Sequence, residues 1–388
     1  MRQRLAAAGA LIAALVLAGS AQSADAPGVT AGSIRIGMFG PLTGPAALGS
    51  KAVLGAAAIY KDASDKGGVN GRKIELVIED DACDPNKAIT AVKKLVGQEQ
   101  VFMVHGGWCS STVLAAKPEI VKDASLPFMV LGAASTAISK PVEKNIFHPV
   151  ATTETVARTM VNFALSKPGA KRVGIISHSD EWGKSHLEPA IAALKAKGAE
   201  PVETVYFERG SLDATSQTLR LREARPDVIL AILYPAEITI FLRDAYKFGV
   251  QASVLGTQGV SLEDTARRVG IPDAVKNFYV FYPLSETMDA PAFQPWIELF
   301  RRHYPNEPLD TVNFLSMTGA LAVLEALKRL GPDVTREGLI AELNKLGTVN
   351  FGIQSAPLTF TPEDHAGVKE GKMITYREGK PTIIAAHP

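Results

Sequence analysis

The segment KIELVIEDDACDPNKA, residues 73–88, joins an apolar run to an acidic turn and then to a helical pattern. The run Lys73–Glu79 is rich in β-branched and other apolar residues, which predicts a strand, and Pro85–Gln98 predicts a helix. A strand followed by a helix is the repeating unit of a parallel sheet with helices on both faces. The segment therefore indicates an α/β fold.

The same alternation continues through most of the chain. The predicted strands are Ser33–Phe39, Lys73–Glu79, Val101–His105, Pro127–Leu131, Arg172–His178, Pro201–Phe207, Asp227–Leu233, Ser253–Thr257, Asn277–Tyr282, Met373–Arg377 and Pro381–Ala386. The predicted helices are Gly49–Lys66, Pro85–Gln98, Ser111–Ala124, Lys184–Lys197, Thr215–Ala224, Ala236–Phe248, Phe293–His303, Thr311–Leu330 and Arg336–Leu346. They form two similar α/β blocks that meet near residues 147–153, followed by a mostly helical tail. We expect two lobes with a cleft, because this length exceeds one comfortable core.

The first 24 residues predict a secretory signal peptide. Arg2 and Arg4 precede the apolar run Leu5–Ala18, which is shorter than the ~20 residues that span a membrane, and small residues follow. No cysteine lies near the cleavage point to accept a lipid anchor, so we expect a soluble periplasmic protein. Without this segment the charge is close to neutral, which argues against nucleic acid as a partner.

Cys83 and Cys109 are the only cysteines of the chain. Cys83 stands among acidic residues, where a thiol could be a metal ligand, a redox centre or half of a disulfide. In an oxidising compartment a disulfide between the two is the simplest interpretation. Zinc would need more ligands than this pair supplies.

The sequence contains no catalytic motif with the required residues at the required spacing. The seven histidines are scattered, and neither HExxH nor GxSxG occurs. Trp182–Ser185 contains the GKS of a phosphate loop without its first glycine, and DDACDP lacks the glycine of a calcium loop. We therefore expect a protein that is not an enzyme and that needs no cofactor or metal.

Small and hydroxyl-bearing residues follow several predicted strands, where open parallel sheets bind their ligands. In GGWCSST, residues 106–112, glycines permit close approach, and the helix start offers N–H donors to a carboxylate. LGAAST, residues 131–136, repeats the arrangement. The alternative is that these serines only cap a helix. In the second block the comparable loops contain Trp182, Tyr234 and Gln258; a tryptophan buried in the core is the alternative for Trp182.

These stretches resemble the periplasmic binding proteins for branched-chain amino acids that serve ABC importers. The resemblance rests on GPLTGP (40–45), KGGVNGRKIELVIEDDACDP (66–85), CSSTVLAAKPEI (109–120), GAAST and YPAE. It implies a type I fold: two doubly wound parallel-sheet lobes joined by a three-segment hinge. It also implies the Cys83–Cys109 disulfide. The expected domains are a signal peptide (1–24), lobe 1 (25–150 plus 283–355) and lobe 2 (151–282 plus 356–388), with crossovers near Pro149–Thr152, Tyr282–Pro283 and Gln354–Pro357.

The resemblance also implies the ligand site. Serine and small-hydroxyl loops of lobe 1 hold the ligand carboxylate, an aromatic residue of lobe 2 covers it, and a tyrosine with an acid takes the α-ammonium group. Gln258 stands where the family has that acid, which is a departure. The implied ligand-binding residues are Leu48, Trp108, Ser110, Ala133, Ala134, Ser135, Trp182, Tyr234, Gln258 and Asn313.

The resulting prediction is a monomeric solute-binding protein that delivers a small carboxylate to ABC permease subunits in the inner membrane. An aromatic or 2-oxo acid without an α-amino group is favoured, because a buried ammonium needs a charged partner. Asp180, Glu181 or Glu237 could still supply that charge, which leaves an amino acid or amide as the alternative. A periplasmic ligand sensor and an enzyme that turns over a small acid are two further candidate functions.

Overall fold

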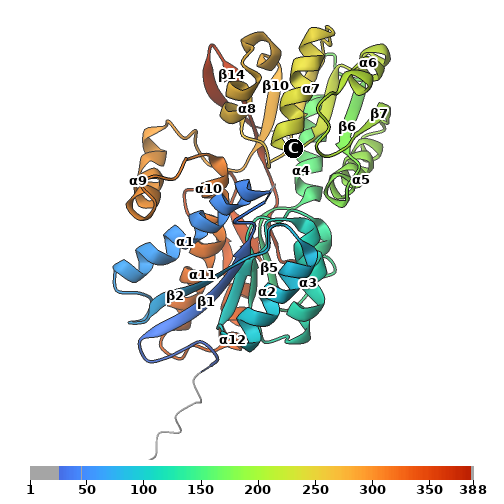
Figure 1. Cartoon of the computed structure of the whole chain (residues 1–388). Coiled ribbons are helices and arrows are strands. Elements are labelled where there is room, and N and C mark those ends of the chain that lie inside the picture. The colour runs from blue at the N-terminus through green and yellow to red at the C-terminus, as the bar shows by residue number, and fades with distance from the viewer. Residues whose placement is uncertain (1–25, 45, 386–388) are drawn as a thin grey trace, which may run out of the picture.

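Two β-sheets organise the chain, and each forms the centre of one lobe (Figure 1). The computed structural model describes residues 26–44 and 46–385. The predicted signal peptide lies outside these residues. The expected bilobed α/β fold, with sheets that are mainly parallel, is confirmed.

The sheet of lobe 1 has the strand order β11-β12-β13-β5-β4-β3-β1-β2. Its strands are β1 (Ser33–Gly40), β2 (Lys73–Asp80), β3 (Met103–Gly106), β4 (Phe128–Val130), β5 (Ile146–Ala151), β11 (Gly347–Val349), β12 (Leu358–Phe360) and β13 (Ala366–Val368). The strands from β13 to β2 pair in parallel, and β11 and β12 are antiparallel. Parallel pairing requires a crossover between strands, which the helices supply.

Helices cover both faces of this sheet. They are α1 (Ser50–Asp65), α2 (Pro85–Gly97), α3 (Ser110–Lys122), α11 (Met317–Leu330) and α12 (Arg336–Asn344). Ile36 and Met38 of β1 pack in one apolar cluster with α1. Phe39 of β1 and Val104 of β3 pack in a second cluster with α2 and α3. Alternate residues of a strand point to opposite faces, so β1 serves two apolar layers.

The sheet of lobe 2 has the order β15-β14-β10-β9-β8-β6-β7. Its strands are β6 (Val173–His178), β7 (Pro201–Phe207), β8 (Val228–Ile232), β9 (Ser253–Gly256), β10 (Phe278–Tyr282), β14 (Lys372–Arg377) and β15 (Lys380–Ala385), and its helices are α4 (Thr153–Ser166), α5 (Glu181–Ala196), α6 (Thr215–Ala224), α7 (Pro235–Lys247) and α8 (Leu262–Val269). The five strands from β10 to β7 are parallel, and β14 and β15 are antiparallel.

The chain passes between the two sheets three times. The passages follow β5, β10 and β13. The third crossover was expected at Gln354–Pro357, and this position is wrong, because β12 and β13 return to the sheet of lobe 1. His365 fixes this return: its ring stacks on Phe147 with centroids 4.2 Å apart, and Nδ1 lies 2.8 Å from the carbonyl oxygen of Ile146. Residues 356–368 therefore belong to lobe 1, and the crossover lies between β13 and β14.

The C-terminal helical block packs on lobe 1. It contains α9 (Gln294–His303) and α10 (Thr311–Leu315), both of which contact α1, followed by α11 and α12 (Figure 1). The predicted helix Thr311–Leu330 is divided at Ser316, whose hydroxyl donates to the carbonyl oxygen of Ala52 at 2.6 Å. None of the described helices is both long and apolar enough to cross a membrane.

Candidate ligand-binding site

Sheet order gathers the predicted residues of lobe 1 at one edge. Strands β1, β3 and β4 are neighbours, and Leu48, Trp108, Ser110 and the Ala133–Ser135 loop follow their carboxyl ends. This edge is where open parallel sheets bind ligands.

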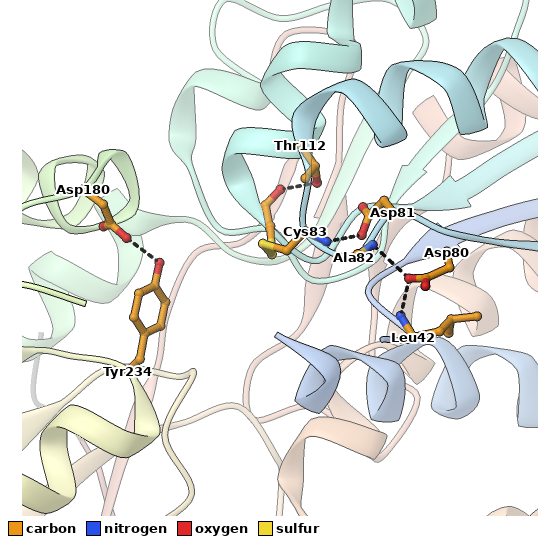
Figure 2. Close-up of a disulfide and its surroundings, with 9 residues drawn as sticks. Leu42, Asp80, Asp81, Ala82, Cys83, Thr112, Asp180 and Tyr234 are labelled. Carbon is orange, nitrogen blue, oxygen red and sulfur yellow. Dashed lines mark hydrogen bonds between the residues drawn. A yellow bond between two sulfur atoms is a disulfide. The ribbon is translucent and has the colours of Figure 1, made fainter. Parts of the chain in front are cut away.

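A disulfide joins Cys83, just after β2, to Cys109, directly before α3 (Figure 2). The two Cα atoms are 5.7 Å apart, an ordinary separation for a bonded pair. The predicted pairing is confirmed. The bond fixes the start of α3, and therefore Ser110, to the end of β2.

Asp80 holds the loop after β1 in place (Figure 2). Its Oδ1 accepts hydrogen bonds from the backbone N–H groups of Leu42, Thr43 and Ala82 at 2.8, 3.3 and 2.8 Å. Desolvation alone would raise the pKa of Asp80, but these hydrogen bonds and one from the Thr43 hydroxyl lower it below its usual value. The loop that leads to Leu48 is therefore fixed by an ionised carboxylate.

Asp81, the next residue, is fully buried, and its pKa is shifted in the opposite direction. Its Oδ1 accepts the N–H of Cys83 at 2.9 Å, and its Oδ2 has no hydrogen-bond partner among the described residues. Burial raises the pKa of Asp81. The protonated form is therefore favoured in the folded protein more than in the unfolded chain.

Ser110 is the first residue of α3 and does not act as its cap. The N-cap is Cys109, and no side chain caps the helix. The buried Ser110 hydroxyl oxygen accepts the N–H of Ser135 at 3.1 Å. A hydroxyl that accepts one bond still has its proton to donate. Ser110 therefore offers a donor beside the first N–H groups of a 13-residue helix, an arrangement suited to an anion.

The loop after β4 supplies fewer backbone donors than the family resemblance implies. The N–H of Ala133 is bonded to the carbonyl oxygen of Gly107 at 3.1 Å, and the N–H of Ser135 is bonded to Ser110. The carbonyl oxygen of Ala134 accepts the N–H of Thr153 at 2.7 Å. The hydroxyl of Ser135, whose side chain is buried, makes no hydrogen bond with the described residues. The hydroxyls of Ser110 and Ser135 are thus better suited than Ala133 to bind a carboxylate.

Trp108 forms a wall between two of these loops. An added Cβ at Gly49 would lie 2.6 Å from its indole ring, and one at Gly132 would lie 2.4 Å from it. Only glycine leaves space for the ring at both positions. The half-buried Trp108 therefore packs the turn that contains Leu48 against the loop after β4.

In lobe 2, β6, β8 and β9 are neighbours, and Trp182, Tyr234 and Gln258 follow them. The rings of Trp182 and Tyr234 stack with centroids 4.4 Å apart and an interplanar angle of 25°. The Tyr234 hydroxyl donates to Asp180 at 3.1 Å. Figure 2 shows Tyr234 and Asp180 on the side of lobe 2 that faces the disulfide of lobe 1, and α3 and α5 are in contact.

Three ionisable residues, Arg209, His178 and Glu237, lie close to Tyr234. The guanidinium of Arg209 lies 4.6 Å from the centre of its ring, and the imidazole of His178 is 4.5 Å away, centroid to centroid. Glu237 accepts the N–H of Gly210 at 3.0 Å and lies 3.7 Å from His178. Burial would raise the pKa of Glu237, but these contacts lower it to about 2, so this carboxylate is ionised and already engaged. The sequence analysis missed Arg209 and His178, although both stand at a strand end.

His186 and Gln258 form a buried polar group beside the aromatic pair. The ring of His186 lies 4.5 Å from that of Trp182, and its Nδ1 lies 3.0 Å from the Trp182 carbonyl oxygen. Its Nε2 has no hydrogen-bond partner in the described part of the chain, and neither does Oε1 of Gln258, which is 7% exposed. Burial lowers the pKa of His186 to about 4. The sequence analysis did not identify His186.

Asn313 has a structural role in lobe 1, and its predicted ligand contact stays a prediction. It is fully buried, and its Oδ1 accepts the N–H of Asp310 at 2.9 Å in the capping box that starts α10. Its backbone lies so close to α1 that only glycine fits at position 55. Leu48 is half-buried in the turn Ala47–Gly49 and stays a prediction.

The two lobes, the three passages between them and the facing strand ends define a bilobed solute-binding protein of type I. In residues 26–44 and 46–385, no group of three or more His, Cys, Asp or Glu side chains could hold a metal ion. The family model described as periplasmic binding protein matches residues 33–380, and the chain belongs to this family.

Similar proteins support this assignment. The chain is 28% identical over 335 residues to Leu/Ile/Val-binding protein homolog 7 of Brucella melitensis, covering 83% of this chain and 82% of the relative. Its structure is similar to the fatty acid ABC transporter substrate-binding protein of Thermomonospora curvata, with a TM-score of 0.80, 26% identity and coverage of 93% and 94%. The branched-chain amino acid transporter substrate-binding protein of Streptococcus pneumoniae has the same fold, with a TM-score of 0.78, 21% identity and coverage of 91% and 99%.

Proposed function

We propose that this protein binds a small carboxylate between its lobes and delivers it to the permease subunits of an ABC importer. Family membership supports the transport role. The names of the Brucella and Thermomonospora relatives refer to amino acids and fatty acids, which share a carboxylate. The hydroxyls of Ser110 and Ser135, beside the start of α3, are suited to that group.

Within this class we propose an aromatic or 2-oxo acid that lacks an α-amino group. The observation that carries this choice is Gln258, an uncharged amide buried in lobe 2. A buried ammonium needs a carboxylate partner, because an unpaired buried charge costs several kcal/mol. Glu237 is engaged with Gly210 and His178, and the cation of Arg209 over Tyr234 would repel an ammonium. The Trp182 ring offers an aromatic face.

One observation favours an amino acid as the second candidate. Asp180 is only half-buried, and one oxygen of its carboxyl group accepts the Tyr234 hydroxyl. Its other oxygen accepts the N–H of Gly183 at 2.9 Å, which caps α5. This carboxylate could take an additional hydrogen bond from an ammonium group.

Calorimetry with matched ligands tests the choice. We expect phenylpyruvate to bind more tightly than phenylalanine, and the 2-oxo acid of leucine more tightly than leucine. Gln258→Glu should shift the preference towards the amino acids, whereas Gln251→Glu, an exposed control in the same lobe, should not. Tighter binding of the amino acid in both wild-type pairs would contradict the proposal and favour the Asp180 alternative.

We also propose that residues 1–24 direct export and that the mature protein works in the periplasm, where the disulfide is stable. Intact mass spectrometry of protein from the periplasmic fraction would show the loss of this segment. Native mass spectrometry of the same sample would show whether a small acid is retained. A retained compound that is converted over time would favour an enzyme instead.

A further inference from the structure

His186 has a defined tautomer. It is 1% exposed, and its Nδ1 lies 3.0 Å from the carbonyl oxygen of Trp182. A carbonyl oxygen can only accept, so Nδ1 must carry the proton. Because burial lowers the pKa of His186 to about 4, the ring is neutral at pH 7. Its Nε2 is then an acceptor.

Gln258 places a second acceptor in the same buried region. Its Oε1 is buried and, like Nε2 of His186, has no donor among the described residues. Gln258 follows β9 and His186 lies in α5, which follows β6; both strands are neighbours of β8, and Gln258 also influences the pKa of the His186 ring. The void that His186 and Thr257 line is too small for a water molecule. Two acceptors cannot bond to each other, and leaving both unpaired costs free energy.

We propose that Gln258 donates its amide N–H to Nε2 of His186 and presents its carbonyl oxygen to the ligand. A half turn about the last side-chain bond exchanges the two amide atoms and so turns the N–H₂ group towards the ring. The exchange gives the His186 acceptor a donor and moves Oε1 out of the buried cluster. His186 is thus a positioning residue: it decides which end of the amide faces outward.

The orientation of the Gln258 amide narrows the class of ligand, and this inference rests on the proposed function. A carbonyl oxygen at position 258 accepts a hydrogen bond, so it matches a neutral donor and has no partner in a carbonyl group. Among acids without an amino group, the structure therefore assigns this site to a hydroxy acid in preference to the corresponding oxo acid. The opposite tautomer of His186 would donate to Oε1, turn the amide N–H₂ outward and favour the oxo acid.

Nuclear magnetic resonance of the ¹⁵N-labelled full-length mature protein tests the tautomer directly. At pH 7 we expect the proton of His186 on Nδ1, and a hydrogen bond from the Gln258 side-chain amide to Nε2. A proton on Nε2, or a Gln258 amide that makes no bond to the ring, would overturn the inference.

Calorimetry then compares phenyllactate, phenylpyruvate and phenylalanine, which share one carbon skeleton. Phenyllactate should bind about tenfold more tightly than phenylpyruvate. His186→Phe should reduce this ratio to about twofold or less, whereas His303→Phe, a control in lobe 1, should preserve it. If the oxo acid binds more tightly than the hydroxy acid, and both bind more tightly than the amino acid, only this inference fails. If phenylalanine binds best, the proposed function fails. Should His186→Phe not fold, the wild-type ratio and the tautomer still decide.

Discussion

Removing the disulfide is expected to destabilise lobe 1 strongly. Cys83 and Cys109 are separated by 26 residues and connect the end of β2 to the start of α3. On the chain-entropy model, a link of this span restricts the unfolded chain enough to contribute about 3.5 kcal/mol at 25 °C. Both cysteines are half-buried, so replacing both by alanine should add only a small packing loss.

Urea unfolding of the oxidised wild type and of the Cys83→Ala/Cys109→Ala variant measures the loss. Because the protein has two lobes, each needs its own signal. Trp108 and Trp296 lie in lobe 1 and Trp182 lies in lobe 2, so Trp→Phe backgrounds that keep only Trp108 or only Trp182 separate the two transitions. The transition of lobe 1 should shift by about 3–4 kcal/mol, and that of lobe 2 should shift little.

A loss below about 1 kcal/mol in lobe 1 would refute the chain-entropy argument for this bond. An equal loss in both lobes would show that the lobes unfold together, and would refute the claim that the bond acts on one of them. Reduced wild type is the matched control, because it keeps every side chain of the oxidised protein.

Three further changes test the contacts of lobe 1. Ser110→Ala should weaken carboxylate binding by about 1–3 kcal/mol in calorimetry, because a charge-assisted hydrogen bond is lost; unchanged affinity would leave Ser110 as a link to Ser135 only. Burial raises the pKa of Asp81, so the contribution of this carboxyl group to stability is lost as the pH rises through its pKa in the folded protein. Asp81→Asn should therefore raise the free energy of unfolding at pH 7 by about 1 kcal/mol. That gain should disappear below the ordinary carboxyl pKa, and a gain independent of pH would exclude this cause. Gly132→Ala should lower stability by about 1–3 kcal/mol, because the new methyl group meets the ring of Trp108, and an unchanged melting temperature would contradict this packing.

The sequence predicts most of the parallel strands because they are buried on both faces. Such strands are continuous apolar runs, and this signal is local. β5 and α4 lie where the first block ends and were not predicted as elements. β5 contains Pro149, which disfavours a strand, and its place in the sheet depends on the distant β13. Thr152, whose hydroxyl accepts the N–H of Thr155 at 3.4 Å, is a capping signal for α4 that the sequence offers.

The third crossover could not be found in the same way. β12 and β13 have three residues each, too few for a periodic pattern. Pro357 looks like an interruption, whereas the decisive contacts connect His365 to Phe147 and Asn344, far away in the chain. Contacts between residues so far apart in the chain produce no recognisable pattern in the local sequence.

The residues of the candidate site were predictable to different degrees in the two lobes. Position after a strand end identifies Ser110, Trp182 and Tyr234, because parallel strands carry their loops to one edge. The same rule would have identified Arg209, which stands two residues after β7. The rule would not have identified His186, which lies about one turn inside α5. His186 and Gln258 come into the same region only because the strands before them, β6 and β9, both neighbour β8. Nor could the rule show that the amide of Ala133 is already bonded to Gly107.

The loop after β4 connects the ligand site to the passage between the lobes. The N–H of Ser135 is bonded to Ser110, while Ala134 accepts the N–H of Thr153 and Thr136 shares a 3.0 Å hydrogen bond with the Thr153 hydroxyl. Thr153 begins α4, the first element of lobe 2 after the first passage. A ligand carboxylate that accepts a hydrogen bond from the Ser110 hydroxyl is therefore connected to the first passage, about which the lobes would rotate, through only two hydrogen bonds. Since a ligand shifts a conformational equilibrium only by its differential contacts, this short connection is where binding in lobe 1 can favour closure of lobe 2.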